Sequence, residues 1–383
     1  MVRENFAPAA ALLVACGRRS LEAPAGAAAK ASLAEDWQAL PDAADRHGMT
    51  AWVQASIADW PDAPEHVRDQ MAQRARLQRM RALQAVSELS TVTSLLSGAG
   101  IETVSMKGPL FARWLYGDAG MRRFADLDLL IDPAQRDRAL QALGAAGYAL
   151  PAGLSAAAAR TVFAGTGAWP LAHATAIGID LHWKLQAVGF GSPLPSGDLL
   201  RDSATTAVAG GAIRIPAPTH AAALALLHAA KHLWASLELT LAIAHLMRRA
   251  DVDWPHVYEL ARRAGAWNGA AAGLALAARI FDVDLPRDLR DRIQPGAVRP
   301  LVDAALRFLA MPDVAGAPLR EELAAHRAGL DGPGDRLRYA AWRLLAPTPL
   351  EAAWWPLPDH LTLLYAPLRL IRLLTVRRRD GGR

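Results

Sequence analysis

The sequence contains a single cysteine, Cys16, among 383 residues. One thiol cannot form a disulfide within the chain, so nothing argues for an oxidising compartment, and we expect a cytoplasmic protein. Apolar runs are also short, since none approaches the roughly 20 residues that a helix needs to span a bilayer. The part of the sequence before the basic C-terminal segment lacks the alternation of aromatic and basic residues along which nucleic-acid bases stack. These absences favour a globular protein without disulfides or membrane spans.

The start of the sequence superficially resembles a secretory signal. One basic residue, Arg3, precedes an apolar stretch over 6–15 that runs into Cys16, as in lipoprotein-type signals. However, Glu4 offsets the single basic charge, and Pro8 interrupts a stretch that is already short. We therefore expect this segment to form the first helix of a domain.

Alanine dominates the apolar composition and favours helix over strand. The chain is 52% hydrophobic and 21% charged, which is typical of a well-packed globular protein. Its length exceeds what one small core supports, so we expect two or three subdomains. Runs rich in alanine, leucine and arginine predict helices over 67–98, 219–249 and 258–281.

Two carboxylates stand two positions apart in the strand-like apolar run 126–131. Alternate side chains of a strand share a face, so Asp126 and Asp128 point one way while Leu127 and Leu129 point into a core. Neighbouring like charges repel unless a cation neutralises them, and a divalent ion such as Mg²⁺ is the usual solution. An isolated pair of this kind also occurs in solvated loops, but the apolar flanks favour a metal site.

A second strand-like run, 177–183, supplies a third acid. Its apolar residues alternate with Asp180, His182 and Lys184, so these three ionisable side chains share one face of the strand. Three carboxylates on neighbouring strands can hold two metal ions for an in-line phosphoryl or nucleotidyl displacement. Asp180 could instead face water at a sheet edge. His182 could tune the site, carry a proton or simply pack in the core.

The basic residues near these strands each have two possible roles. Arg122 could contact a nucleotide phosphate or pair with Asp126 or Asp118. His228 and His232 share one face of the helix predicted over 219–247, at a spacing that can chelate a metal. Without a glutamate between them and a third soft ligand, packing or phosphate contact is the better interpretation than zinc.

The order of motifs along the chain resembles a known family. Lys107-Gly108 is followed by Leu-Tyr-Gly-Asp at 115–118, Arg122, Asp-Leu-Asp-Leu-Leu-Ile at 126–131, Gly147-Tyr148 and Asp-Leu-His-Trp at 180–183. This order is similar to that of the uncharacterised bacterial nucleotidyltransferase family of the DNA-polymerase-beta-like superfamily. The likeness continues through Leu-His-Ala-Ala-Lys-His-Leu-Trp at 227–234, Asp253-Trp254 and Leu285-Pro286, and it covers residues from about 10 to 290. One departure is Leu241-Ala242-Ile243, where the family usually carries an aspartate.

The resemblance implies an α+β fold, in which a small mixed β-sheet with helices on one side is embedded in N- and C-terminal helical subdomains. The expected division is an N-terminal helical region over 1–95, a nucleotidyltransferase core over 96–215, a helical domain over 216–300, and a helical or irregular region with a basic tail over 301–383.

The resemblance also implies roles for the motif residues. Asp126 and Asp128 would be metal ligands, and Asp180 would complete the second metal site and help to deprotonate the acceptor. Lys107, Gly108 and Arg122 would hold the triphosphate. Glycine permits close approach of a phosphate, and the following Pro109 fits the first turn of a helix. The cofactor would be Mg²⁺ or Mn²⁺, and a nucleoside triphosphate would be the donor.

The acceptor, the activity and the partner of the basic tail each have more than one interpretation. Members of the family often accompany bacterial peptide natural-product pathways, which implies a small-molecule or peptide acceptor. The unusual Lys-Gly-Pro loop and the missing aspartate are also consistent with a non-catalytic nucleotide-binding protein. The pI of about 9.7 is consistent with a nucleic-acid-directed nucleotidyltransferase. Arginines at 369, 372 and 377–379 predict a docked helix with a charged tail, whose alternative partners are an acidic protein, a nucleic-acid backbone or an anionic membrane surface.

Overall fold

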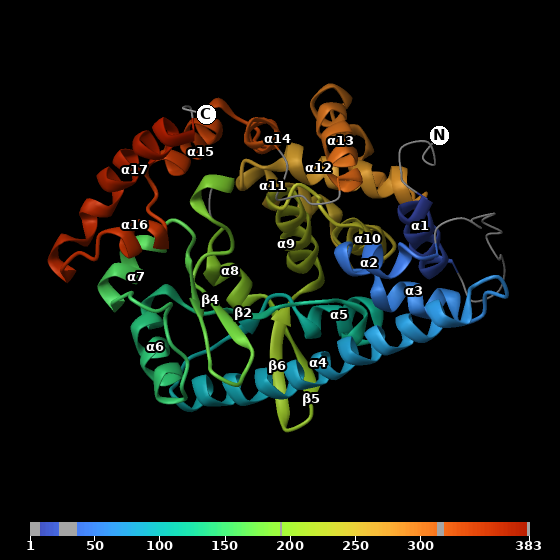
Figure 1. Cartoon of the computed structure of the whole chain (residues 1–383), viewed down its shortest axis with the longest axis horizontal. Helices are drawn as coiled ribbons and strands as arrows, with labels where there is room; N and C mark the ends of the chain where they lie inside the picture. The colour runs from blue at the N-terminus through green and yellow to red at the C-terminus, as the bar shows by residue number, and fades with distance from the viewer. Residues whose placement is uncertain (1–7, 23–36, 192–193, 312–317, 381–383) are drawn as a thin grey trace.

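Helices make up most of the protein and surround two small sheets (Figure 1). The computed structural model describes residues 8–22, 37–191, 194–311 and 318–380, with side chains omitted at 8, 188 and 376–380. The first helices are α1 (Pro8–Leu21), α2 (Leu40–Arg46), α3 (Thr50–Ile57) and α4 (Glu65–Gly98). Those interleaved with the strands are α5 (Pro109–Tyr116), α6 (Arg136–Ala145), α7 (Ala156–Val162) and α8 (Ser196–Arg201). The predicted α+β class is confirmed.

The remaining helices follow the last strand. They are α9 (Pro218–Lys231), α10 (Leu237–Met247), α11 (Trp254–Arg263), α12 (Trp267–Phe281), α13 (Pro295–Ala310), α14 (Leu319–Gly329), α15 (Pro333–Leu345), α16 (Pro349–Trp354) and α17 (Tyr365–Asp380). No helix among the described residues is both long enough and apolar enough to cross a membrane.

The main sheet is mixed, as expected. Its strands are ordered β1 (Val104–Ser105), β2 (Asp126–Leu130), β4 (Gly178–His182) and β3 (Ala168–Leu171). The central strands β2 and β4 are parallel, while β1 and β3 pair antiparallel at the edges. The parallel register sets Asp128 directly beside Asp180. A separate hairpin joins β5 (Ser203–Val208) to β6 (Gly211–Pro216).

One face of the main sheet builds the smaller core. Leu127 and Leu129 of β2 and Ile179 and Leu181 of β4 alternate onto this face and are fully buried. Their partners come from helices α4, α6 and α7, and include Leu89, Leu96, Leu143 and Val162. In Figure 1 α4 runs along the lower edge of the molecule, from α2 and α3 at one end to α6 at the other. The two central strands are therefore anchored on the long helix.

The opposite face carries the acids and is covered only in part. Leu130, at the far end of β2 from Asp126, packs in a small cluster with Met106 and with Leu224 of α9. Proline at position 218 opens α9 in the first-turn position that suits it. This packing holds α9 against the sheet at one end. The carboxylates of β2 and β4 consequently face the side of α9.

The larger core lies in the helical part of the molecule. It combines residues of α1–α3 with residues of α9–α13, for example Leu13, Val53, Leu241 and Ile280. The helices before and after the main sheet therefore share one hydrophobic core. The four-part division of the chain stays a prediction.

Two helices expected as continuous are each broken by a left-handed turn. The helix predicted over 219–247 is α9 followed by α10, and Leu233 and Trp234 between them have φ angles of 54° and 53°. This turn is stabilised by burial of Trp234 and by its backbone N–H, which donates to the Ala229 carbonyl at 2.8 Å. The run 258–281 is interrupted between α11 and α12 at Gly265, whose φ of 67° suits glycine.

The C-terminal helix α17 docks on the protein as predicted. Arg369 and Arg372 point to Glu351 of α16, which is fully buried, and Arg369 lies 3.6 Å from its carboxylate. Two of the tail arginines are thus internal. For the arginines at 377–379 the structure describes the backbone and not the side chains. At the other end of the chain, α1 includes the helical segment expected around Cys16, which is buried.

Candidate active site

The loop between β1 and α5 brings Lys107 to the acid face. Gly108 has a φ of 73°, a left-handed conformation that glycine adopts without strain, and Pro109 then opens α5. The turn leaves Lys107 beside β2, where its Nζ lies 3.0 Å from Oδ1 of Asp128. The Lys-Gly-Pro sequence therefore positions a cation against the central carboxylate.

Asp128 is the most buried of the three predicted acids. It is 9% exposed, whereas Asp126 and Asp180 are half-buried. Its Oδ1 also lies 3.0 Å from Nε2 of His182 on the neighbouring strand. Both contacts reach the same carboxylate oxygen. His182 thus lies at the acid cluster, as its position on the strand predicts.

The electrostatic environment separates the three carboxylates. Burial raises the pKa of Asp126 to about 6, with the negative charges of Asp128 and Asp180 adding to the effect. Burial also raises the pKa of Asp180, and the charge of Asp128 adds to this while His182 opposes it. For Asp128 burial acts in the same direction, but Lys107 and His182 outweigh it and hold its pKa well below the usual range.

These groups could hold a metal ion. One ligand atom each from Asp128, Asp180 and His182 lie within 4.8 Å of one another, and within the described ranges no other three histidine, cysteine or acidic side chains do so. Carboxylate oxygens suit hard divalent cations such as Mg²⁺ and Mn²⁺, and imidazole is a further acceptable donor. The residues present therefore fit a divalent metal. A cation here would also offset the repulsion that raises the pKa of Asp126.

Helix α9 and the residue after it place two histidines next to the acids. His228 and His232 lie near its end with their ring centroids 4.5 Å apart. Burial, Lys231 and Lys107 lower the pKa of His232 to about 4, and burial and Lys107 lower the pKa of His228 well below its usual value. Both rings are therefore neutral at pH 7. With no third ligand near them in the part of the chain that the structure describes, the zinc alternative has no support.

Lys231 is a site residue that we did not predict. Restricted hydration and the positive charge of Lys107 lower its pKa, while all three acids, Asp126, Asp128 and Asp180, act on it in the opposite sense. It therefore lies within electrostatic range of the whole acid cluster. A sequence signal was present, because Lys231 is three positions after His228 on the same helix.

Arg122 forms a buried ion pair that the sequence did not reveal. Its Nε lies 3.1 Å from Oε1 of Glu238, with side-chain exposures of 11% and 7%. Its guanidinium also lies 5.5 Å from the ring centroid of Phe111. Of the partners considered from the sequence, Asp118 pairs with Arg79 instead, at 3.8 Å. No local pattern links Arg122 to Glu238, which begins a helix far along the chain.

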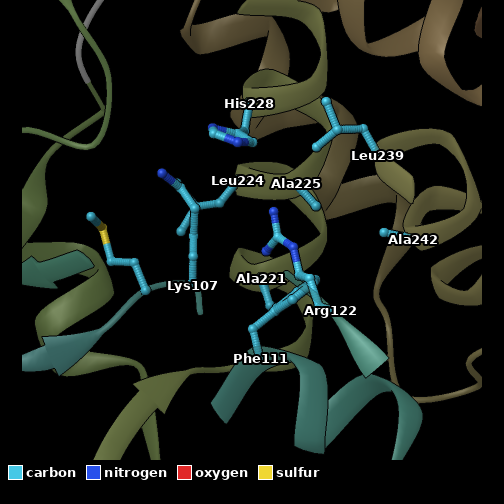
Figure 2. Close-up of a pocket in the computed structure, with 10 residues that line it drawn as sticks. Lys107, Phe111, Arg122, Ala221, Leu224, Ala225, His228, Leu239 and Ala242 are labelled. Atoms are coloured by element: carbon cyan, nitrogen blue, oxygen red, sulfur yellow. The ribbon is translucent and has the colours of Figure 1, made fainter. Parts of the chain in front are cut away.

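Lys107, Arg122 and His228 meet at one small cavity. Figure 2 shows the nitrogen-bearing ends of these three side chains directed into the same space, which is otherwise lined by apolar residues such as Leu224 and Leu239. The cavity measures about 20 Å³, so the basic side chains themselves occupy most of the region. Both cations are already paired with an acid, Lys107 with Asp128 and Arg122 with Glu238.

The side chain of Lys184 points toward the segment after α7. Its Nζ donates a 2.8 Å hydrogen bond to the carbonyl of Ala164, beyond the end of α7. Loss of hydration and the charge of Arg136 lower its pKa. An accessory role for Lys184 stays a prediction.

Comparison with known families agrees with this geometry. A family described as uncharacterised nucleotidyltransferase matches residues 34–282, which include both central strands and helices α9 to α12. No curated protein matches the chain, and no solved structure does so. The match covers well over half of the sequence and contains all the acids of the candidate site. The chain therefore belongs to this uncharacterised nucleotidyltransferase family.

Proposed function

We propose that the protein is a metal-dependent nucleotidyltransferase, which moves a nucleoside monophosphate from a nucleoside triphosphate to a small-molecule or peptide acceptor. One observation carries the proposal: Asp128, Asp180 and His182 converge, Asp126 lies within electrostatic range of both acids, and basic groups from the β1–α5 loop and from α9 lie beside them. Divalent metal on the acid side and triphosphate on the basic side would each neutralise one half of this arrangement. Family membership supports the same reaction class.

The acids have distinct tasks in this proposal. Asp126 and Asp128 would hold two Mg²⁺ or Mn²⁺ ions, and Asp180 would complete the second position with His182 beside it. When bound, such ions act as Lewis acids that stabilise negative charge on the phosphate and leaving group. The contact from His182 to Asp128 would hold that carboxylate beside Asp180, its register partner on β4.

The chain's own basic groups bind and orient the donor. Lys107 and Lys231 would contact the triphosphate, and Arg122, held in place by Glu238 at its Nε, would donate hydrogen bonds from its terminal nitrogens. Gly108 leaves room for a phosphate beside the loop, because a Cβ there would find its nearest neighbour only at 4.0 Å.

The reaction forms one phosphorus–oxygen bond and breaks another. The acceptor oxygen attacks the α-phosphorus, and the bond from that phosphorus to the bridging oxygen breaks, so that pyrophosphate leaves with the electron pair. The acceptor proton passes to Asp180, which is half-buried and lies beside Asp128 on the neighbouring strand.

Calorimetric titration of ATP, CTP, GTP and UTP, each with Mg²⁺ or Mn²⁺, tests the site. We expect at least one nucleotide to bind in a metal-dependent way, and an Asp126→Ala/Asp128→Ala variant to lose that binding. An Asp62→Ala/Asp69→Ala variant is the matched control, because both side chains are exposed acids outside the candidate site and the charge change is the same. Folded wild-type protein that binds none of the four nucleotides would overturn the proposal.

A second candidate function is nucleotide binding without turnover. The ion pair between Lys107 and Asp128 favours it, because the lysine already neutralises one metal-ligand position. Release of pyrophosphate in the presence of acceptor extracts separates the two functions. Binding without release would support the second, whereas release that disappears in the Asp126→Ala/Asp128→Ala variant would support the transferase.

A further inference from the structure

A groove separate from the small basic cavity lies between α4 and the segment that precedes β2. It measures about 170 Å³, and four arginines line it: Arg74, Arg81, Arg122 and Arg123. Asp45 is the one acid among its lining residues. Leu77 and Phe124 add apolar wall, and Leu77 is 52% exposed although it is apolar.

The charges in this groove do not balance. Arg74 lies 2.5 Å from Asp45 and 2.9 Å from Asp42, so the carboxylate in the groove is already neutralised. Arg122 is matched by Glu238. Arg81 and Arg123, by contrast, are exposed and have no acidic partner among the residues that the structure describes. Two uncompensated cations therefore face one concave surface.

The groove also adjoins the candidate active site. Arg122 lines both this groove and the cavity that contains Lys107 and His228. Phe124 lies two positions before Asp126, and two residues of chain span at most about 7 Å. A ligand held in the groove could therefore reach the acid cluster with a group a few atoms away.

We propose that this groove is the acceptor subsite and that it recognises an oxyanionic group, a phosphate monoester or a carboxylate, on the acceptor. Arginine suits such groups because its planar donors match two oxygens at once. Leu77 and Phe124 would contact the carbon skeleton next to the anion. The inference rests on the proposed transferase function, since it names the chemistry of the molecule that receives the nucleotide.

Two probes test the subsite on the full chain: glycerol 3-phosphate and malate, which carry the two kinds of oxyanion and a free hydroxyl. Calorimetry of the wild type and of an Arg81→Glu/Arg123→Glu variant would measure each probe and, separately, each nucleotide with Mg²⁺. An Arg287→Glu/Arg299→Glu variant is the matched control, because it makes the same charge change at exposed arginines outside the groove.

We expect the wild type to bind at least one probe, and Arg81→Glu/Arg123→Glu to weaken that binding at least about tenfold, as expected for the loss of charge-assisted contacts. Nucleotide binding should stay within about twofold in both variants. Preference for glycerol 3-phosphate would identify the acceptor group as a phosphate, and preference for malate as a carboxylate.

Three outcomes would overturn the subsite. They are a wild type that binds neither probe, equal probe affinity in Arg81→Glu/Arg123→Glu, and a parallel loss of nucleotide binding, which would assign the groove to the donor. Failure of the proposed function looks different: the wild type would bind no nucleotide, yet the groove variant would still lose the probe.

Discussion

The two faces of strands β2 and β4 differ although their residues alternate one by one. Leu127 and Leu129 lie in a hydrophobic core against α4, while Asp126 and Asp128, which alternate with them, face the α9 side. The apolar face gains stability from each side chain that it buries. The acid face is costly, as the pKa of about 6 at Asp126 shows, because burial and like charges disfavour the ionised form. The same strands thus build a hydrophobic core on one side and carry the acids of the candidate site on the other.

The largest effect is expected on the acid face. Asp128→Asn should lower pyrophosphate release about 10³-fold, comparable to the loss of a preorganised electrostatic group, and this corresponds to about 4 kcal/mol in the activation barrier. Thermal stability at neutral pH should also fall, because the contacts of Lys107 and His182 to ionised Asp128 outweigh the cost of burying it, and asparagine loses them. Turnover assays and calorimetric unfolding would measure both quantities. A folded variant with full activity would show that the reaction does not need the carboxylate of Asp128.

Leu129, the next residue in the chain, should affect stability and leave activity unchanged. Leu129 is fully buried in the sheet core, so Leu129→Ala should lower the free energy of unfolding by about 3 kcal/mol through lost burial and a cavity. Activity per folded molecule should stay near the wild-type level at low temperature, because the side chain points away from the acids. Leu83→Ala on α4 is the control: that leucine is 71% exposed, and the expected change is below about 0.5 kcal/mol. Loss of activity without loss of stability in Leu129→Ala would contradict the comparison.

His245 is a buried ionisable group for which the described residues provide no acidic partner, in contrast to Asp128 with its lysine and histidine. His245 stacks on Trp52 at 5.2 Å and lies 3.1 Å from Oγ of Ser20, and burial followed by the charge of Arg248 lowers its pKa to about 4. Since the unfolded chain then binds more protons below about pH 6.5, His245 should reduce stability as the pH falls toward 4.

The size of this effect can be isolated with one variant. Between about pH 7.5 and about pH 5.5, wild type should lose about 1 kcal/mol more than His245→Gln, which keeps a polar side chain but does not titrate. Urea unfolding at several pH values would measure the difference. Parallel pH profiles for the two proteins would show that His245 can be protonated in the folded state without cost.

The sequence predicted the chemistry of each strand better than the relation between strands. Alternation of apolar and acidic residues identified β2 and β4 and the faces of Asp128 and Asp180. It could not supply their register, because parallel pairing joins segments that are far apart in the chain. Edge strand β3 was not singled out: it is four residues long and contains Pro170. The β5–β6 hairpin was also missed, although the Gly210-Gly211 pair is a turn signal.

Tertiary context explains the other differences. Leucine and tryptophan disfavour the left-handed conformation, so no local rule predicts the turn at Leu233 and Trp234, which is stabilised by burial in the helical core. The pair of Arg122 and Glu238 likewise forms only when α10 is in place. The candidate acids were therefore predictable from a local pattern. The position of Lys231 beside them depends on how α9 packs against the sheet.

The smallest effect is expected for an aspartate that lies outside both faces. Asp137 on α6 lies 3.5 Å from Arg160, with side-chain exposures of 66% and 45%, so solvent screens the pair. Asp137→Asn should change the free energy of unfolding by no more than about 0.5 kcal/mol and leave pyrophosphate release unchanged. Urea unfolding beside Asp128→Asn makes the comparison direct, because the same chemical change is made at an exposed and a buried site. A loss above about 1 kcal/mol at Asp137 would mean that exposure does not separate the two aspartates, and that the acid face owes its properties to something other than burial.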